Sequence, residues 1–451
     1  MKALLKIPRQ LMMTAMEDLE RPHPFAGERL GFFSFRQSVH PERPLLLCYD
    51  YHPIADDHYI PDETCGGRIG GDAIRVAMGR SFREMSGQLW VHTHGRRGQP
   101  RASATDLAEG PKVTQSLANA QPGAIQGWAV ISEEGTAGQI RALEGHLHRL
   151  TNLAVVGWPM KVPVREASKL ELGSILGMLK KGGKRDTRYD RQSFLGEHSQ
   201  TIFENAKVGI VGLGGGGSHI NQQLAHIGFQ RVVLCDGDRV EGTNLNRLVG
   251  ATLQDVRKRR HKVYIANRLF KKLQPDAEID DRPARWEEKR EALRDCDLIF
   301  GCLDSFCARR DLEAFCRSLM IPLIDIGMAV LRPDGAVPEI IGQAIVSMPG
   351  EHCMHCLQFL TSENLTREAQ RYDGSPQPQV VWPNGVLAST AVGYAVVLLT
   401  GWSGATTPSC RVDYRGSQMT LSPSNLAAAL GARRCAHFPL SKTGDPVFRK
   451  L

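Results

Sequence analysis

Apolar runs in the first 160 residues predict one α/β unit. Strand-like runs occur at 29–35, 44–51, 88–93 and 126–132, and the stretch 71–86 between the second and the third has the spacing of a helix. Residues 165–187 include LKKGGKRDT, a polar, glycine-containing sequence typical of a connector. We therefore expect a first domain at 1–160 and a linker at 161–187.

From residue 188 onward, strands alternate with helices. KVGIVG, RVVLCDGD, DLIFGCLD and IPLIDIGM read as strands, and the segments after Gly214, around 255–274 and around 308–319 read as helices. Such alternation predicts a mostly parallel sheet with both faces covered. We expect a Rossmann-like α/β domain at 188–451, in which residues 402–451 form a weakly defined tail.

Composition adds limits on location and partners. The chain has 451 residues, which is too many for one ordinary core. Apolar runs such as 393–399 are far short of a membrane span, and the N-terminal sequence MKALLKIPRQ lacks the apolar core of a signal peptide. We expect a cytoplasmic protein without a membrane partner. The net charge of +8 is spread along the chain, which favours anionic partners but predicts no specific nucleic-acid binding.

A glycine-rich turn marks a candidate phosphate site. Gly212, Gly214 and Gly217 form G-x-G-x-x-G directly after an apolar strand and at the start of a predicted helix. Glycine lets the backbone approach phosphates closely, and the helix N-terminus offers free N–H groups. Alone, this motif favours an ordinary dinucleotide fold, with a structural glycine turn as the alternative.

The second strand of this domain favours a triphosphate. Asp236 ends that strand and can accept hydrogen bonds from ribose hydroxyls. Polar groups that can bind a metal ion and neutralise phosphate charge follow it, namely Asp238, Asn244, Arg247 and Lys262. The competing interpretations are a turn for Asp238 and a solvated helix face for the two cations.

Six ordered segments together resemble the ThiF/MoeB family of ubiquitin-activating-type adenylyltransferases. They are RYDRQ (188–192), GLGGGGS (212–218), DGDRVEGTNLNR (236–247), Lys262, CLDSFCAR (302–309) and NGVLASTAVG (384–393). The resemblance implies that Asp236 holds the ribose of ATP, and that Asn244, Arg247 and Lys262 surround the phosphates. It also implies that Asp304 holds Mg²⁺, and that Arg191 acts in trans on the nucleotide of a partner subunit in a homodimer.

The reaction implied by this resemblance is the attack of a carboxylate on the α-phosphate of ATP. The family's carboxylate donors usually end in a flexible Gly-Gly tail, so a ubiquitin-like protein is the expected partner. Many relatives also carry a catalytic cysteine shortly before the GVL segment, but residues 357–409 of this chain contain no cysteine. The alternative nucleophiles for a thioester are Cys302, Cys307, Cys353 and Cys356, and direct transfer of the adenylate to a thiol elsewhere remains open.

The sequence CMHC resembles the first half of the structural zinc site of this family. Cys353 and Cys356 form the pair, and the second half is reduced to Cys435 and His437 in RRCAHF. A Cys3His set suits tetrahedral zinc. Reduced cysteines packed against apolar neighbours are the competing interpretation.

Two histidines of the first domain suggest a second metal site. His92 and His94 are two residues apart on a predicted strand and therefore face the same way. Asp106 follows twelve residues after His94, and two histidines with one carboxylate make an open zinc site. A surface strand pair without a metal is the competing interpretation.

This pattern resembles the JAMM/MPN metallopeptidase family, whose members have a curved mixed sheet flanked by helices. The resemblance implies that His92, His94 and Asp106 bind Zn²⁺, that Glu28 is the general base and that Ser103 polarises the oxyanion. Spacing departs from the commoner form, since eight residues separate His94 from Ser103.

The leading hypothesis from both resemblances is one chain that processes and activates a ubiquitin-like protein. The setting would be a bacterial-type conjugation or antiviral defence system with a conjugating-enzyme partner. Two alternatives remain. The adenylating domain serves sulfur transfer or the activation of a small peptide, or one of the two modules is a pseudoenzyme that only docks the partner.

Overall fold

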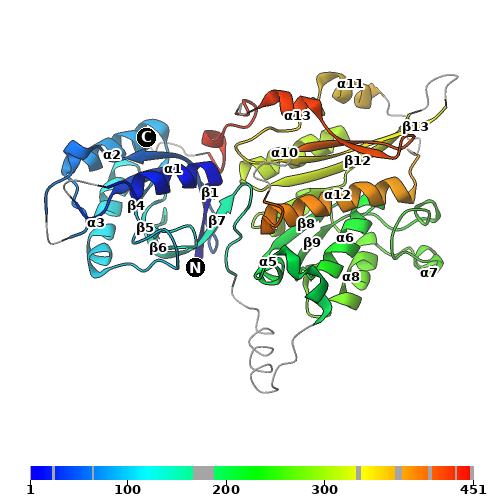
Figure 1. Cartoon of the computed structure of the whole chain (residues 1–451), viewed down its shortest axis with the longest axis horizontal. Coiled ribbons are helices and arrows are strands. Elements are labelled where there is room, and N and C mark those ends of the chain that lie inside the picture. Colours follow the sequence, from blue (N-terminus) through cyan, green and yellow to red (C-terminus); the bar gives the residue numbers. More distant parts are fainter. Residues whose placement is uncertain are drawn as a thin grey trace, which may run out of the picture. The chain divides into compact units, whose positions relative to one another are not determined.

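The computed structural model describes residues 2–22, 26–62, 65–165, 187–331, 337–370, 378–404, 409–431 and 434–446. These residues form two compact units. The first contains the chain up to Gly157, the short piece Ser318–Met320 and the stretch from Phe438 onward, and the second contains the rest from Trp158 to His437. Most of the predicted linker, residues 166–186, lies outside the described residues. The elements of both units are labelled in Figure 1.

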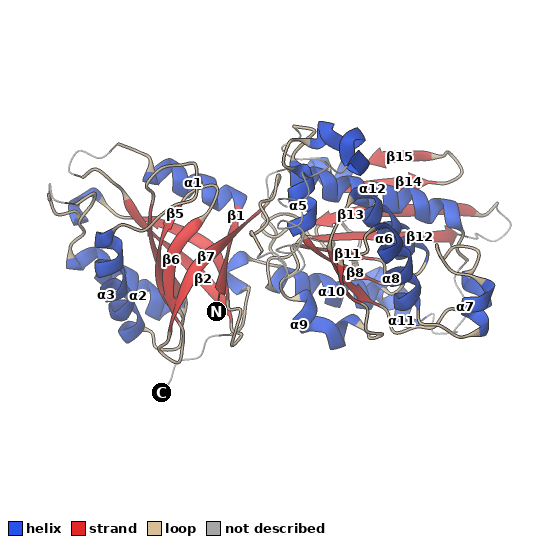
Figure 2. Cartoon of the chain, turned by 90° about the horizontal axis from the view of Figure 1, so that it is seen from below, coloured by secondary structure: helices blue, strands red, loops and turns tan. Residues whose placement is uncertain are grey.

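The first unit is a closed seven-stranded barrel with helices against it. Its sheet order is β1-β3-β2-β4-β5-β6-β7, and β1 closes the barrel by pairing in parallel with β7. Figure 2 shows the barrel strands in red. The strands are β1 (Lys2–Pro8), β2 (Leu30–Ser38), β3 (Leu45–Pro53), β4 (Gly87–His92), β5 (Gln126–Ile131), β6 (Thr136–Arg141) and β7 (Leu147–Val156). The helices are α1 (Arg9–Leu19), η1 (Asp56–His58), α2 (Gly71–Glu84) and α3 (Ala104–Ala120).

Two apolar layers hold the barrel together. Residues of α1, including Met12 and Met16, pack with barrel side chains such as Phe33 and Leu46. Residues of α2 and α3 pack on other barrel side chains, with Trp128 at the centre. Alternate residues of β2, β4 and β5 therefore serve two different cores, which is why these three strands read as continuous apolar runs rather than as alternating ones.

The second unit contains an eight-stranded sheet of order β10-β9-β8-β11-β12-β13-β14-β15. Strands β8 to β12 are parallel and the last three pair antiparallel. The strands are β8 (Lys207–Val211), β9 (Arg231–Cys235), β10 (Glu278–Asp280), β11 (Leu298–Gly301), β12 (Leu323–Leu331), β13 (Glu339–Ser347), β14 (Arg411–Arg415) and β15 (Thr420–Pro423). The predicted parallel Rossmann-like core is confirmed, and the antiparallel extension is an addition to it.

The helices of the second unit cover both faces of this sheet, as Figure 2 shows. The α-helices are α5 (Ser199–Asn205), α6 (Gly215–Ile227), α7 (Leu253–Arg257), α8 (Lys262–Leu273), α9 (Arg290–Leu293), α10 (Phe306–Ser318), α11 (Ser362–Gln370), α12 (Val381–Thr400) and α13 (Asn425–Leu430). Short 3-10 helices are η2 (Thr187–Leu195), η3 (Gly242–Asn244), η4 (Trp286–Lys289) and η5 (Leu440–Lys442), of which η5 belongs to the first unit. The single helix predicted around 255–274 is wrong, because Arg259 has a positive φ of 46° and separates α7 from α8.

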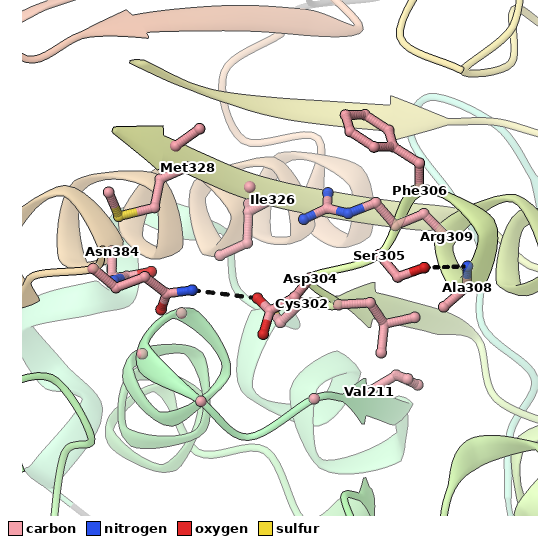
Figure 3. Close-up of a pocket in the computed structure, with 18 of the residues that line it drawn as sticks. Val211, Cys302, Asp304, Ser305, Phe306, Ala308, Arg309, Ile326, Met328 and Asn384 are labelled. Carbon is pink, nitrogen blue, oxygen red and sulfur yellow. Dashed lines mark hydrogen bonds between the residues drawn. The ribbon is translucent and has the colours of Figure 1, made fainter. Parts of the chain in front are cut away.

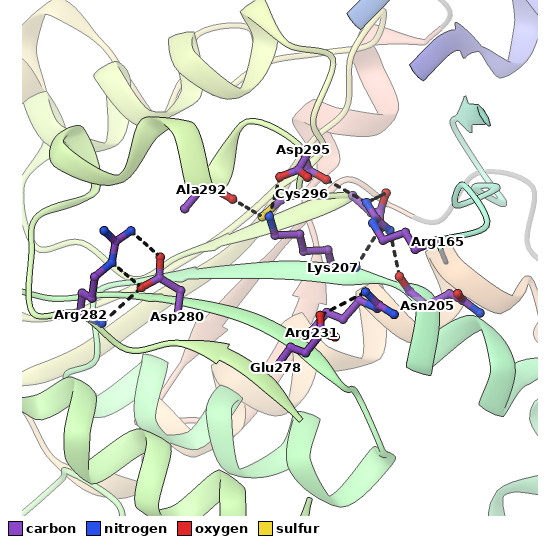
Figure 4. Close-up of polar contacts among 11 residues, drawn as sticks. Arg165, Asn205, Lys207, Arg231, Glu278, Asp280, Arg282, Ala292, Asp295 and Cys296 are labelled. Carbon is purple, nitrogen blue, oxygen red and sulfur yellow. Dashed lines mark hydrogen bonds and ion pairs between the residues drawn. The ribbon is translucent and has the colours of Figure 1, made fainter. Parts of the chain in front are cut away.

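The predicted boundaries of the second domain need correction at both ends. Arg165 donates to Asn205 O (2.8 Å) and pairs with Asp297, whose Oδ2 also accepts the Lys207 N–H (2.8 Å), so this end of the connector is fixed to the sheet (Figure 4). At the other end, the backbone N–H of Asp445 donates to Gln37 O at 2.7 Å. The predicted weak tail therefore splits into β14, β15 and α13 in the second unit and a final stretch in the first.

Helix α12 is long and apolar enough to cross a membrane, by length and composition alone. More than half of its apolar window is buried inside the protein. Its side chains pack on α6 and on strands β12 and β13. This is the position of a core helix, and no other described helix meets the same two criteria.

The turn between α7 and α8 supplies a test of stability. Asp255 closes a capping box with Thr252 and receives two hydrogen bonds from Arg268, at 2.7 and 2.8 Å. The hydrogen bonds from Arg268 hold the pKa of Asp255 well below its usual range. The carboxylate therefore stabilises the fold above about pH 4, and this contribution is lost as the pH falls through the folded-state pKa. We expect Asp255→Asn to lower the free energy of unfolding by ~1–3 kcal/mol at neutral pH.

Urea unfolding at pH 7 and at pH 3 measures this effect. The deficit of the variant is expected to shrink at the lower pH, because Asp255 of the unfolded wild-type chain is then mostly protonated, whereas the folded carboxylate keeps its charge. Asp276→Asn, at an exposed position after α8, is the control. An equal loss of stability in both variants would contradict the assigned role of Asp255.

Candidate functional site

A glycine-lined turn opens the main pocket of the second unit. Strand β8 ends at Val211 and is followed by Gly212, which has a φ of 88° and whose added Cβ would lie 2.4 Å from Cys302 O. An added Cβ on Gly217 would lie 1.9 Å from Gly212 O. Both positions therefore require glycine, and they let α6 start directly behind the strand. The free N–H groups of the α6 N-terminus face a cavity of about 1210 Å³.

Most of the nucleotide-binding residues expected from the sequence line this cavity. Gly217 does not, since it serves the close packing of the turn instead. Figure 3 shows the cavity from the side of β11 and α10. The predicted residues that line it are Gly212, Gly214, Asp236, Asp238, Asn244, Arg247, Lys262 and Asp304.

Asp236 shapes the glycine-rich turn. Its Oδ2 accepts the Leu213 N–H and its Oδ1 accepts the Asp238 N–H, both at 2.8 Å. Burial raises the pKa of Asp236, and the nearby Lys262 ammonium, 3.8 Å away, acts in the opposite direction. The carboxylate thus fixes the loop at the mouth of the cavity, and its contact with a ribose remains a prediction.

The two predicted phosphate cations do not lie on a solvated helix face. The Lys262 side chain is 12% exposed and its ammonium lies 2.7 Å from Asp238. Arg247 donates to Thr243 O at 2.7 Å and to Asn246 Oδ1 at 2.9 Å. Both cations are therefore oriented by their own chain toward the cavity.

Asp304 lies in the turn from β11 to α10, on the opposite wall of the cavity. Its Oδ1 accepts a hydrogen bond from Gln379 Nε2 at 3.3 Å. Its exposed carboxylate faces the same space as the α6 N-terminus. Asp304 is therefore the residue that would hold a divalent cation, which would neutralise charge on bound phosphates.

Arg191 does not line this cavity. It is exposed, in η2, at the start of the described part of the second unit. Its proposed action on the nucleotide of a partner subunit therefore remains a prediction.

The four candidate zinc ligands of the second unit lie together. Cys353 Sγ and Cys356 Sγ are 3.6 Å apart, and His437 Nδ1 lies 3.5 Å from the first and 3.4 Å from the second. Cys435 Sγ is 3.7 Å from Cys356 Sγ. Sulfur and nitrogen atoms at these mutual distances form the corners of a tetrahedron that fits Zn²⁺.

A loop held by α10 carries the first two of these ligands. Arg317 donates to the carbonyl oxygens of Met348 and His352, and Glu313 Oε1 accepts the Met354 N–H at 2.7 Å. The His355 ring stacks on His437. Neighbouring side chains therefore hold both the loop with the two cysteines and the His437 ring in place, without a metal ion.

The histidines of the first unit also converge. His92 Nε2 and His94 Nε2 are 3.1 Å apart, and they lie 3.1 and 3.6 Å from the two oxygens of Asp106. Glu28 Oε1 is 3.6 Å from His94 Nε2. These groups come from the end of β4, the loop after it, the start of α3 and the segment before β2.

Asp106 has two tasks in this cluster. Its Oδ2 accepts the Ser103 N–H at 2.7 Å and Ser103 Oγ accepts the Asp106 N–H at 3.2 Å, which caps α3. Burial alone would raise the pKa of Asp106, but the hydrogen bond with His92 and the neighbouring groups lower it to about 2. The carboxylate therefore stays charged and can bind a cation together with the two imidazoles.

Comparison with known proteins decides the family of the second unit. The family model described as "ThiF family" matches residues 189–430, which is more than half of the chain. The chain belongs to the ThiF family. The match begins after the first unit, so it does not bear on the His92 cluster.

Curated ThiF relatives are similar over part of their length. Molybdopterin-synthase adenylyltransferase of Escherichia coli is 29% identical over 48% of this chain and 82% of its own length. The enzyme of the same name from Salmonella typhimurium is 31% identical over 39% of this chain and 70% of its own length. The SAMP-activating enzyme E1 of Haloferax volcanii is 30% identical over 38% of this chain and 61% of its own length. Among solved structures, E. coli MccB with ATP has 21% sequence identity and a TM-score of 0.44. The match covers 58% of this chain and 80% of the MccB chain.

Two cysteines of this ThiF chain line the nucleotide cavity. Burial raises the pKa of the Cys302 thiol. Cys307, at the start of α10, also has a raised pKa, through burial and the neighbouring Glu368 carboxylate. Neither thiol is activated in this state. Cys353 and Cys356 belong to the zinc-type cluster. Of the four alternative nucleophiles, two therefore lie in the cavity wall and two in this cluster.

Sequence reasoning missed several residues of the cavity. Asn384 packs its amide against the start of α6, since an added Cβ on Gly215 would lie 2.6 Å from Asn384 Nδ2. Gln379 holds Asp304, and Arg309 lines the wall between α10 and β12. Asn384 and Arg309 lie inside the NGVLASTAVG and CLDSFCAR segments, where the motifs gave the only available signal.

Proposed function

We propose that the second unit uses ATP to adenylate the C-terminal carboxylate of a ubiquitin-like protein. One observation carries this proposal. The phosphate-binding turn, the cations Arg247 and Lys262, and the carboxylate Asp304 all face one cavity. A dehydrogenase of the same fold needs the turn but not the opposed carboxylate and cations.

The chain's own groups divide the work in this proposal. The α6 N-terminus and the two cations bind the phosphates and neutralise the charge that develops as pyrophosphate leaves. A carboxylate oxygen of the substrate attacks the α-phosphorus, the bond from that phosphorus to the pyrophosphate oxygen breaks, and no proton transfer is needed. Bound at Asp304, Mg²⁺ would supply further charge stabilisation. Positioning and electrostatics therefore account for the rate.

The names of the relatives support the class of substrate. They include enzymes named for a sulfur carrier protein and for a ubiquitin-like modifier, besides the SAMP-activating enzyme. We infer a partner of that class with a Gly-Gly-type C-terminus. A homodimer in which Arg191 reaches the nucleotide of the other subunit belongs to the same proposal.

A second candidate function is adenylation for sulfur transfer. The absence of cysteine between residues 357 and 409 favours it, because such chemistry needs no thioester on the adenylating chain. Several relatives are molybdopterin-synthase adenylyltransferases. The His92 cluster of the first unit argues for the processing function instead.

ATP–pyrophosphate exchange tests the adenylation proposal. The full chain is mixed with a ubiquitin-like protein encoded beside it, ending either in Gly-Gly or in the same residues with a C-terminal amide. Exchange is expected with the free carboxylate alone. Exchange with neither form, in protein shown to bind ATP, would favour a small-molecule acid as the substrate.

For the first unit we propose a zinc peptidase that trims or removes the same partner. His92, His94 and Asp106 would hold the ion, Glu28 would take the proton of the attacking water, and Ser103 would face the oxyanion. A bound zinc ion would supply a water of lowered pKa. The convergence of the three ligand side chains with Glu28 supports this proposal, and so does the close packing of the Glu28 carboxylate on Gly66, where an added Cβ would lie 2.4 Å from Glu28 Cδ.

Glu28→Gln separates peptidase action from docking. We expect the variant to keep its zinc and to cleave a ubiquitin-like protein extended beyond Gly-Gly at least about 100-fold more slowly than wild type. The pair His92→Ala/His94→Ala should lose one zinc equivalent by metal analysis. If the wild-type chain binds no zinc at these histidines, the first unit is a docking module.

A further inference from the structure

Arg309 is a buried cation in the wall of the nucleotide cavity. It lies in the first turn of α10 and is only 6% exposed, yet it lines the cavity close to Asp304. Figure 3 shows its guanidinium between Phe306 and Ile326, directed along the cavity wall. The functions assigned above do not use this cation.

The guanidinium is held in one orientation. Its Nη1 pairs with the fully buried Asp325, and its centre lies 5.5 Å from the ring centroid of Phe359. An ion pair at one edge and an aromatic ring over the face leave the other edge of the planar group for a ligand. Among the described residues, no further hydrogen-bond partner of this guanidinium is seen.

Gln343 points its amide to the same place. Gly327 of β12 is the register partner of Gln343 of β13, so the two positions share one face of the sheet. An added Cβ on Gly327 would lie 2.6 Å from Arg309 Nη2, 2.9 Å from Arg309 Nη1 and 2.7 Å from Gln343 Nε2. Three nitrogen donors from two elements therefore converge above a residue that has no side chain.

This group of nitrogen donors from Arg309 and Gln343 suits a carboxylate on a small terminal residue. A guanidinium fork with an amide donor matches the oxygens of a carboxylate, and burial strengthens the interaction. Gly327 and Ala329 face the cavity on β12, opposite Ile341 and Gln343 on β13, so an extended chain with small side chains fits along this ribbon. Asp304, on the same wall, repels a carboxylate, so a fixed cation beside it is needed to hold the substrate.

We propose that Arg309 and Gln343 bind the C-terminal carboxylate of the substrate before it attacks ATP, and that the missing side chain of Gly327 leaves room for these two donors. This inference rests on the adenylation proposed above. One carboxylate oxygen is held by the donors and the other remains free to attack.

The kinetics of exchange with a ubiquitin-like protein ending in Gly-Gly test this assignment. We expect Gln343→Met and Arg309→Lys to raise the apparent KM for that protein roughly 10- to 100-fold, and to leave the KM for ATP within about twofold. Gly327→Ala should also raise this KM, because the added Cβ would lie 2.6 Å from Arg309 Nη2 and 2.7 Å from Gln343 Nε2 and would displace both donors. Arg310→Met is the matched control, because Arg310 is the exposed neighbour that pairs with Asp311.

Several outcomes would overturn the assignment. Arg309→Lys could destabilise the fold through Asp325, so Gln343→Met, which leaves that ion pair intact, is the decisive variant, and thermal unfolding is measured for both. An unchanged KM for the protein probe in Gln343→Met and Gly327→Ala refutes the assignment alone. A complete lack of exchange in the wild-type chain refutes the proposed function and this assignment with it.

Discussion

Replacing Asp304 with alanine is expected to lower the rate of ATP–pyrophosphate exchange by about 100- to 1,000-fold, or ~3–4 kcal/mol in the barrier. Asp304 is the carboxylate that faces the phosphate turn across the cavity, and it is held there by Gln379. Without it, the protein would lose the carboxylate that would hold Mg²⁺ and, with it, the charge stabilisation that the ion would supply. The exchange rate at saturating ATP is the measurement.

The affinity for ATP distinguishes catalysis from binding in this variant. The glycine turn, Arg247 and Lys262 are untouched, so binding of ATP is expected to persist. Asp311→Ala is the control, because Asp311 is an exposed carboxylate on α10, the helix that follows Asp304. A variant that exchanges at the wild-type rate would show that Asp304 has no part in the reaction.

The second large effect is expected at the Cys3His cluster. The double variant Cys356→Ser/Cys435→Ser should contain one zinc equivalent less than wild type and should unfold at a markedly lower temperature. The two cysteines join segments 79 residues apart in the chain, and zinc binding is coupled to folding in such sites. Metal analysis and thermal unfolding are the measurements.

Cys410→Ser is the control for this pair. Cys410 lies just before β14, is half-buried and has no place in the cluster. The control should keep the zinc content and the unfolding temperature of wild type. Equal zinc content in the double variant and the control would mean that these cysteines are ordinary reduced thiols.

The nucleotide site could be predicted because its parts stand at the carboxyl ends of parallel strands. Gly212, Asp236 and Asp304 each follow a short apolar strand, and the ends of neighbouring parallel strands meet at one edge of a sheet. Local sequence therefore determines the site once the alternation of strands and helices is known. His92 and His94 also converge, as their spacing predicted, although β4 ends at His92 and His94 lies in the loop after it.

Long-range pairing could not be predicted in the same way. Strand β1 pairs with β7, about 150 residues later, and nothing within the segment KALLKIP indicates that partner. The return of the stretch after His437 to the first unit depends on two backbone hydrogen bonds, from Gly444 and Asp445, and on a few polar groups. The break between α7 and α8 could not be predicted from the sequence, because Arg259 adopts a left-handed conformation that its residue type rarely takes.

Arg309 shows what motifs alone leave out. The segment CLDSFCAR was recognised for Asp304, and its last residue looked like one more helix cation. The role of Arg309 depends on Asp325 and Gly327 of β12 and on Gln343 of β13, which lie elsewhere in the sequence. Only the packing of α10 on these strands brings the four residues together.

Transfer of label from ATP to the ubiquitin-like partner tests the central claim most directly. The full chain is incubated with a partner ending in Gly-Gly and with ATP labelled either at the α- or at the γ-phosphate, and the acid-quenched protein is analysed for bound label. Adenylation predicts label on the partner from α-labelled ATP alone, and its loss in Asp304→Ala. Label from γ-labelled ATP would mean that the carboxylate is phosphorylated instead, and would contradict the account.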